Sequence, residues 1–157
     1  MITQLMLIAW ATTAAGFDAR HHRLPNWLTL GGLLAGSLYA LTTGTSLLGG
    51  SAANAMFATV IAFLLLLPAY LAGWMGAGDV KLLAAMAMLG GGKILLPTLV
   101  IGSVVTGIGA LAFMLFGRRL AQVELPRKRP LPFGVGLALG FALSVLDVFP
   151  MLAWDHV

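Results

Sequence analysis

The stretch AANAMFATVIAFLLLLPAYLAG, residues 52–73, contains no charged side chain. A helix of this length, at ~1.5 Å per residue, spans the ~30 Å hydrocarbon layer of a bilayer. The whole chain has the same character, since 60% of its 157 residues are hydrophobic, 9% are charged and its mean hydropathy is +0.99. Soluble globular domains carry about 25% charged residues. The composition therefore indicates that lipid is the solvent of this chain.

Five further apolar runs surround this stretch, and most of them are long enough, or nearly so, for a membrane-spanning helix. They cover residues 2–17, 26–43, 80–91, 94–117 and 131–152. Short connections join them, and no linker or low-complexity tract divides the sequence. We therefore predict an all-α fold, a polytopic membrane bundle of six transmembrane helices that forms one integral-membrane domain over residues 1–157.

Charge predicts how this bundle is oriented. With six alternating helices, eight of the nine basic residues fall on one side and only Lys93 falls on the other. The eight are Arg20, Arg23, Lys81, Arg118, Arg119, Arg127, Lys128 and Arg129. The positive-inside rule places them in the cytoplasm and both chain ends outside. This accounts for the net charge of +4 without a nucleic-acid partner. Residues 1–15 contain no Lys or Arg, so we expect a retained helix there and no cleavable signal peptide.

Small residues recur at spacings that suit helix packing in lipid. The pairs are Gly32 with Gly36, Ser103 with Gly107, and Gly136 with Gly140. Such pairs let helix backbones approach closely, so we expect them at helix–helix contacts. The chain has no cysteine, and His21, His22 and His156 lack the spacing of zinc ligands. We therefore expect no metal and no cofactor.

Two of the five acidic residues differ from the others in their surroundings. Asp18 is predicted to end the first helix and Asp79 to open the fourth, both at the cytoplasmic side. The fourth run spans only ~18 Å, which places Asp79 below the membrane surface. Taken singly, each acid could be an ordinary helix-end residue or N-cap. Held together at membrane depth, they predict a functional site. Water is expected to solvate Glu124 and Asp155, and Asp147 is expected at the outer interface.

The segment Gly73-Trp74-Met75-Gly76-Ala77-Gly78-Asp79-Val80-Lys81 surrounds one of these acids with glycine. Because Gly76 and Gly78 lack a Cβ atom, we expect the backbone to turn tightly there and another chain to approach closely. Such a backbone suits an enzyme that must hold an extended strand of its substrate.

These residues resemble the type IV prepilin peptidases, which are GxGD-type aspartic membrane proteases. Gly76-Ala77-Gly78-Asp79 has the form GxGD and continues into Val80-Lys81. Asp18, followed by Pro25-Asn26, is similar to the first catalytic segment of that family, and Pro132-Phe133-Gly134 is similar to its third signature. The resemblance implies that Asp18 and Asp79 are catalytic in an endopeptidase. Its expected role is to remove the leader of a prepilin or pseudopilin at the cytoplasmic face of the bacterial inner membrane.

Two departures from the family pattern are informative. Only seven residues separate Asp18 from Asn26, so there is no room for the cysteine-containing N-methyltransferase insertion of the large bifunctional enzymes. The chain is therefore similar to the short, peptidase-only branch associated with Flp/Tad pili (CpaA/TadV-like). Val135 stands where a second proline often follows Pro-Phe-Gly, which bears on the local loop and not on the carboxylates.

The resemblance leaves several supporting roles open. Lys81 either contacts a substrate carbonyl or carboxylate, or only contributes to topology by snorkelling. Pro25 and Asn26 are expected to start the second helix. Pro132, Phe133 and Gly134 either line the substrate path or simply initiate the last helix.

Other functions are also compatible with intramembrane acids. A signal-peptide-peptidase or presenilin-like enzyme fits poorly, because Phe17 precedes Asp18 and the only Pro-Ala pair, Pro68-Ala69, lies before the GxGD segment. A small acid-dependent membrane transporter would use the acids for proton coupling. A non-catalytic subunit of a pilus-assembly machine would keep the helices and tolerate loss of either acid. The partners expected besides substrate are membrane lipids.

Overall fold

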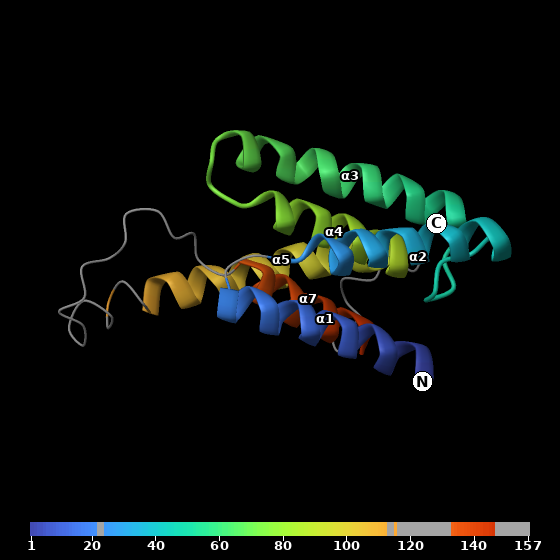
Figure 1. Cartoon of the computed structure of the whole chain (residues 1–157), viewed down its shortest axis with the longest axis horizontal. Coiled ribbons are helices and arrows are strands. Elements are labelled where there is room, and N and C mark those ends of the chain that lie inside the picture. Colours follow the sequence, from blue (N-terminus) through green and yellow to red (C-terminus); the bar gives the residue numbers. More distant parts are fainter. Residues whose placement is uncertain (22–23, 113–114, 116–132, 147–157) are drawn as a thin grey trace.

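The computed structural model describes residues 1–21, 24–112, 115 and 133–146, and in this part of the chain the fold is all-helical. Its six helices run in parallel and antiparallel directions along one long axis (Figure 1). They are α1 (Ile2–His21), α2 (Asn26–Thr43), α3 (Ala52–Leu71), α4 (Ala77–Gly90), α5 (Gly92–Ala112) and α7 (Phe133–Val145). Within these residues there is no strand, only an isolated bridge between Thr45 and Ser51. The all-α prediction is confirmed.

The helix bounds differ from the apolar runs mainly at their ends. α2 coincides with the predicted run 26–43, whereas α1 continues to His21 instead of stopping at residue 17. Asp18 therefore lies inside the last turn and does not end the helix. The apolar run ends at residue 17 because Asp18 is charged. The helical hydrogen bonding of the backbone does not depend on apolar side chains, so the helix continues to His21. α4 likewise begins three residues before the predicted run, at Ala77. Of the run 131–152 the structure describes α7, while Pro132 and Asp147 lie outside the described residues.

The end of α3 is set by a glycine. Ala72 caps the helix, and Gly73 adopts a positive φ of 74°. This left-handed conformation is nearly free of strain only in glycine, so it turns the chain sharply after the helix. The Trp74 N–H then donates to the Ala69 carbonyl, which satisfies a terminal acceptor of α3. This turn directs residues 74–76 back toward the start of α4.

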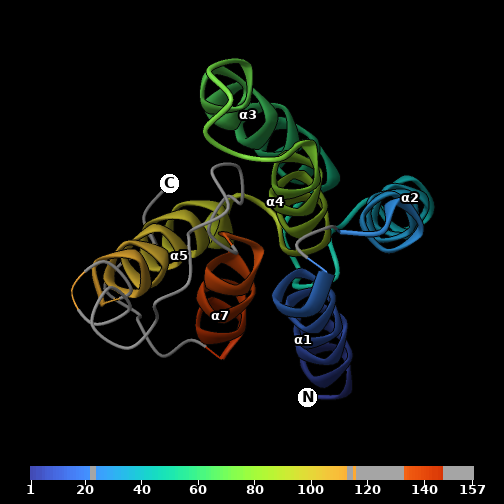
Figure 2. The same cartoon turned by 60° about the vertical axis from the view of Figure 1, so that its left-hand side comes forward.

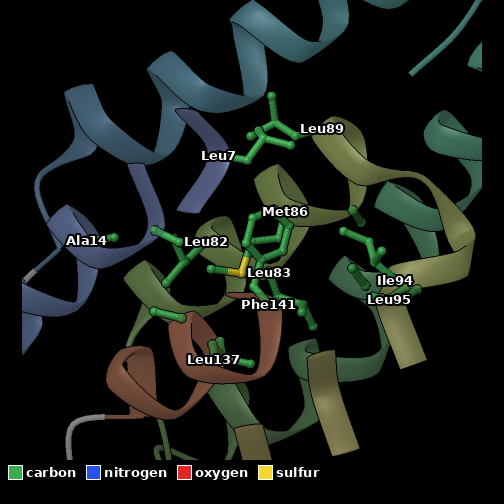
Figure 3. Packing of buried hydrophobic residues seen from close by; sticks show 14 of the residues in the cluster. Leu7, Ala14, Leu82, Leu83, Met86, Leu89, Ile94, Leu95, Leu137 and Phe141 are labelled. Carbon is green, nitrogen blue, oxygen red and sulfur yellow. The ribbon is translucent and has the colours of Figure 1, made fainter. Parts of the chain in front are cut away.

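The shortest of the predicted spans, α4, is the centre of the bundle. It packs against α2, α3, α5 and α7 (Figure 2). Apart from Lys81, every residue from Asp79 to Gly90 is buried. Figure 3 shows part of this core, where Leu82, Leu83 and Met86 of α4 lie beside Leu137 and Phe141 of α7. The helix is apolar all round because neighbours enclose it, which is the pattern of a buried helix.

α5 and α7 approach each other closely along a seam of small residues. A Cβ atom on Gly140 would lie 2.5 Å from the Thr98 carbonyl oxygen and 2.9 Å from the Gly102 nitrogen. Gly136 is equally confined by Gly102 and Thr106. In lipid, where apolar surfaces gain little by leaving the solvent, such van der Waals packing is a main source of helix association.

The small-residue predictions are partly right. Gly136 and Gly140 lie at a helix contact as expected, and so do Gly32, against Trp10, and Gly36, against Met88 and Leu89. The pair Ser103 and Gly107 is wrong, because both residues are exposed and no atom lies within 4 Å of a Cβ placed on Gly107. The face of α5 that meets α7 carries Gly102 instead. Spacing alone does not specify which face of an apolar helix is covered.

In the described part of the chain, two helices, α3 and α5, are long and apolar enough to cross a membrane, judged by length and composition. The arrangement of six transmembrane helices stays a prediction.

Replacing Gly140 by alanine is expected to destabilise the bundle by about 1–3 kcal/mol, since the added methyl group overpacks the seam between α5 and α7. The free energy of unfolding in detergent micelles, measured by denaturant titration, tests this. Gly107→Ala is the matched control, because its methyl group meets open space and alanine favours the helix. Equal stability of the two variants would show that the seam is not closely packed.

Candidate active site

Asp18 and Asp79 come from different helices and meet at one end of the bundle. Asp18 lies in the last turn of α1 and Asp79 in the first turn of α4. Their side chains are only 6% and 8% exposed. The two carboxylates lie close enough for their charges to interact. The structure thus brings together two buried acids that are 61 positions apart in sequence.

The backbone before α4 orients the carboxylate of Asp79. Gly76 is the N-cap residue, with extended backbone at φ −83° and ψ 154°. Its N–H donates to Oδ2 of Asp79 at 3.2 Å, and the Asp79 N–H donates back to the Gly76 carbonyl at 3.2 Å. Asp79 is therefore the third residue of the helix and not its N-cap. Its carboxylate is held by a charge-assisted hydrogen bond to the preceding turn.

The two GxGD glycines lie where the chain enters α4. Neither has a positive φ, and Gly73 makes the left-handed turn before them. The hydrogen bond from the Asp79 N–H to the Gly76 carbonyl closes the turn that begins at Gly76. The expected close approach does occur at Gly78, where a Cβ atom would lie 3.0 Å from the Cβ of Leu24. A Cβ on Gly76 would meet only ordinary contacts, the nearest being Oδ2 of Asp79 at 3.7 Å. Gly78 is thus the more constrained of the two.

The first turn of α7 packs directly on Asp18. A Cβ atom on Gly134 would lie 2.7 Å from Oδ2 of Asp18, so only glycine leaves room for the carboxylate there. Phe133 is half-buried and packs against the apolar core. The first N–H groups of an α-helix have no intrahelical acceptor, and its N-terminus favours negative charge. This third predicted segment therefore meets Asp18 through Gly134, while Pro132 lies outside the described residues.

The start of α2 is tied to α4. Pro25 caps α2 with φ −67° and ψ 135°, and Asn26 is the first helical residue, as predicted. The Lys81 Nζ donates a hydrogen bond to Oδ1 of Asn26 at 3.1 Å. This connects the remaining supporting residues, Pro25, Asn26 and Lys81, to the same end of the bundle as the two acids.

Aromatic residues and a leucine at this end were not predicted from sequence. The Phe17 ring centroid lies 5.9 Å from that of His21 and 5.9 Å from that of Trp27. Leu24 contacts Gly78 and packs against the core. A lone leucine in a short connection carries no pattern that distinguishes it. Phe17 directly precedes Asp18, and Trp27 directly follows Asn26. Only this nearness to the predicted site residues could have indicated from sequence that they lie at the site.

The chemistry available at this end is that of two adjacent carboxylates, which can share, take up and release protons. Among the described residues, no three His, Cys, Asp or Glu side chains cluster in a way that could hold a metal ion.

The sequence model of the type IV leader peptidase family matches residues 5–111, which is more than half of the chain and includes both acids and the GxGD segment. Searches of curated proteins and of solved structures found no significant match. The matched region ends before Phe133 and Gly134, so the family match does not include α7. The structure places α7 beside the matched region, because Gly134 contacts Asp18. On this match, the chain belongs to the type IV leader peptidase family.

Proposed function

We propose that this peptidase is an aspartic endopeptidase of the GxGD type whose catalytic residues are Asp18 and Asp79. The family accounts for leader-peptide cleavage. The observation that carries the aspartic mechanism is the meeting of two buried carboxylates, one from α1 and one from α4, at one end of the bundle. Buried acids of this kind are expensive to maintain in a membrane protein, which favours a catalytic role over a structural one.

Two buried carboxylates whose charges interact do not both ionise readily, so in the proposed mechanism the pair shares one proton. The ionised member takes a proton from a water molecule, which attacks the scissile carbonyl. The protonated member polarises that carbonyl and then protonates the leaving amine. The two acids titrate as a pair, so neither has a fixed role as base.

The neighbouring segments support this chemistry by close packing. Gly76 holds Oδ2 of Asp79 through its N–H. Gly134 leaves room for the carboxylate of Asp18 against the first turn of α7. In the proposed mechanism these contacts fix both carboxylates before substrate binds, which lowers the cost of reaching the transition state.

The surface of the bundle suits lipid on several helices. Large apolar side chains are exposed along α2, α3 and α5 as well as α1. Among the most exposed are Leu5, Met6, Leu34, Leu38, Leu41, Phe57, Leu64, Val104 and Ile108. Exposed large apolar side chains in this number, on several helices, favour a membrane environment. It supports the proposal that all six helices span the bacterial inner membrane, with the acids near the cytoplasmic face and the N-terminus outside.

The proposed substrate is the leader of a prepilin or pseudopilin of the Flp/Tad type. Four residues, 22–25, connect α1 to α2, so no domain is inserted after Asp18. This favours a peptidase that cuts without N-methyltransferase activity.

Asp18→Asn and Asp79→Asn are each expected to reduce leader removal by at least about 10²-fold, because each leaves a single ionisable carboxyl in the dyad. Co-expression with a candidate prepilin and electrophoretic separation of precursor from mature pilin measure the effect. Asparagine keeps the size of each side chain, and comparable amounts of membrane-inserted protein control for folding.

Normal processing by either variant would contradict the aspartic mechanism. If both variants still assembled pili and the wild-type chain did not cleave the prepilin, the chain would be a non-catalytic assembly subunit. Proton-dependent solute flux into proteoliposomes, with no cleavage by the wild type, would indicate a transporter.

Gly134→Ala is expected to lower the rate of cleavage by about tenfold or more, because the added methyl group displaces the carboxylate of Asp18. Gly31→Ala on α2 is the control, since its methyl group meets no atom within 4 Å. Initial rates of leader cleavage in detergent compare the two. Equal rates would show that α7 does not position Asp18.

The proposed orientation can be tested by labelling, because the chain has no native cysteine. Arg20→Cys, at the end with the acids, is expected to react with a membrane-impermeant maleimide only after the cells are lysed. Ala53→Cys, at the opposite end of the bundle, is expected to react in intact spheroplasts. The reverse pattern would contradict the positive-inside orientation.

A further inference from the structure

The hydrogen bond between Lys81 and Asn26 joins two segments that are far apart in the chain. Lys81 Nζ donates to Oδ1 of Asn26 at 3.1 Å across 55 sequence positions. Lys81 is only partly exposed, so its ammonium group is directed to α2 and does not simply extend into solvent. A hydrogen bond with a charged donor is stronger than one between neutral groups.

A second contact acts at the same place. Leu24, in the connection between α1 and α2, lies so near Gly78 that a Cβ atom there would be 3.0 Å from the leucine Cβ. The connection and the start of α2 are therefore held to the beginning of α4 at two points, by packing of Leu24 on Gly78 and by the hydrogen bond of Asn26 with Lys81. Because this connection is only four residues long, its position also restrains the end of α1.

The end of α1 and the start of α4, which these contacts hold, carry the two acids. Asp18 is in the last turn of α1, three residues before that helix ends at His21. Asp79 is two residues before Lys81 on α4, and two residues correspond to about 200° around an α-helix. Lys81 is thus directed to α2 from the side of α4 roughly opposite Asp79, so it can fix the turn without occupying the space between the acids.

We propose that Lys81 is a positioning residue, whose hydrogen bond to Asn26 holds the first turn of α4, and with it the carboxylate of Asp79, in register with Asp18. This role rests on the proposed aspartic mechanism and adds a residue to it. It differs from both roles considered from sequence, substrate contact and topological charge. A misplacement of about 1 Å in a catalytic group can lower the rate about 100-fold, so a hydrogen bond outside the dyad can affect turnover.

Steady-state cleavage of a purified prepilin by the detergent-solubilised full chain tests this role. Lys81→Met and Asn26→Leu each remove one side of the bond at similar size. Each is expected to lower kcat roughly 10- to 100-fold and to leave KM within about twofold, because substrate binding is not altered. Lys81→Arg and Asn26→Asp keep a donor and an acceptor, and we expect them to retain kcat within about threefold. The double variant Lys81→Met/Asn26→Leu should be no slower than the slower single variant, since both substitutions break one interaction.

A distance measurement gives a readout that does not depend on activity. Gly31→Cys on α2 and Ala77→Cys in the first turn of α4 provide two sites for spin labels in a chain that has no other cysteine. Pulsed electron paramagnetic resonance should give a narrow distance distribution with Lys81 present and a broader one with Lys81→Met. Lys81→Arg should restore the narrow distribution.

Three results would overturn the proposal. A rise in KM at unchanged kcat in Lys81→Met would indicate substrate contact. Losses that multiply in the double variant would show that the two side chains act independently. Wild-type kcat together with an unchanged distance distribution in Lys81→Met would leave only the topological role. Failure of the proposed function is distinct from all three, because the wild-type chain would then not cleave, or Asp18→Asn and Asp79→Asn would cleave normally.

Discussion

Enclosure of α4 by α2, α3, α5 and α7 is the constraint on which the other features of the bundle depend. From Leu82 to Gly90 this 14-residue helix is buried and carries no charged side chain, so its two charged residues, Asp79 and Lys81, both lie near its start. Its single acid is therefore at the first turn, where backbone N–H groups are available and the helix N-terminus favours negative charge. The same enclosure requires neighbours that can pack tightly against α4.

Close packing in turn depends on residues without large side chains. Gly102, Gly136 and Gly140 let α5 and α7 approach, and this brings the start of α7 onto the end of α1. Gly134 then leaves the space that the carboxylate of Asp18 occupies, and Gly78 leaves the space that Leu24 occupies. Since apolar burial contributes little to helix association in lipid, these contacts serve both stability and the geometry of the site.

The site consequently combines segments that lie far apart in the sequence. Membership of the leader peptidase family accounts for the cleavage reaction, and the family match itself covers residues 5–111. The structure adds α7 through Gly134 and relates Lys81 to Asn26, so that all three segments resembling prepilin peptidase motifs converge on one end of the bundle. In the mechanism we propose, Asp18 and Asp79 perform the chemistry and the surrounding contacts fix the separation between them.

The sequence by itself determined the helices and the identity of the two acids. Long apolar runs predict helices whatever their neighbours are, and scarce charges in an apolar chain are conspicuous, so α2 was predicted to the residue and Asp18 and Asp79 were singled out. Only the tertiary structure decided which faces meet. It showed that Gly102 packs in the seam while Ser103 and Gly107 are exposed, and that Gly73 makes the left-handed turn before α4. It also showed that Leu24 of the α1–α2 connection packs on α4 at Gly78, and that Lys81 of α4 bonds to Asn26 of α2. The physical reason is that a helix in this chain is apolar on every side, so its pattern specifies that it is buried in lipid or protein but not which neighbour covers each face.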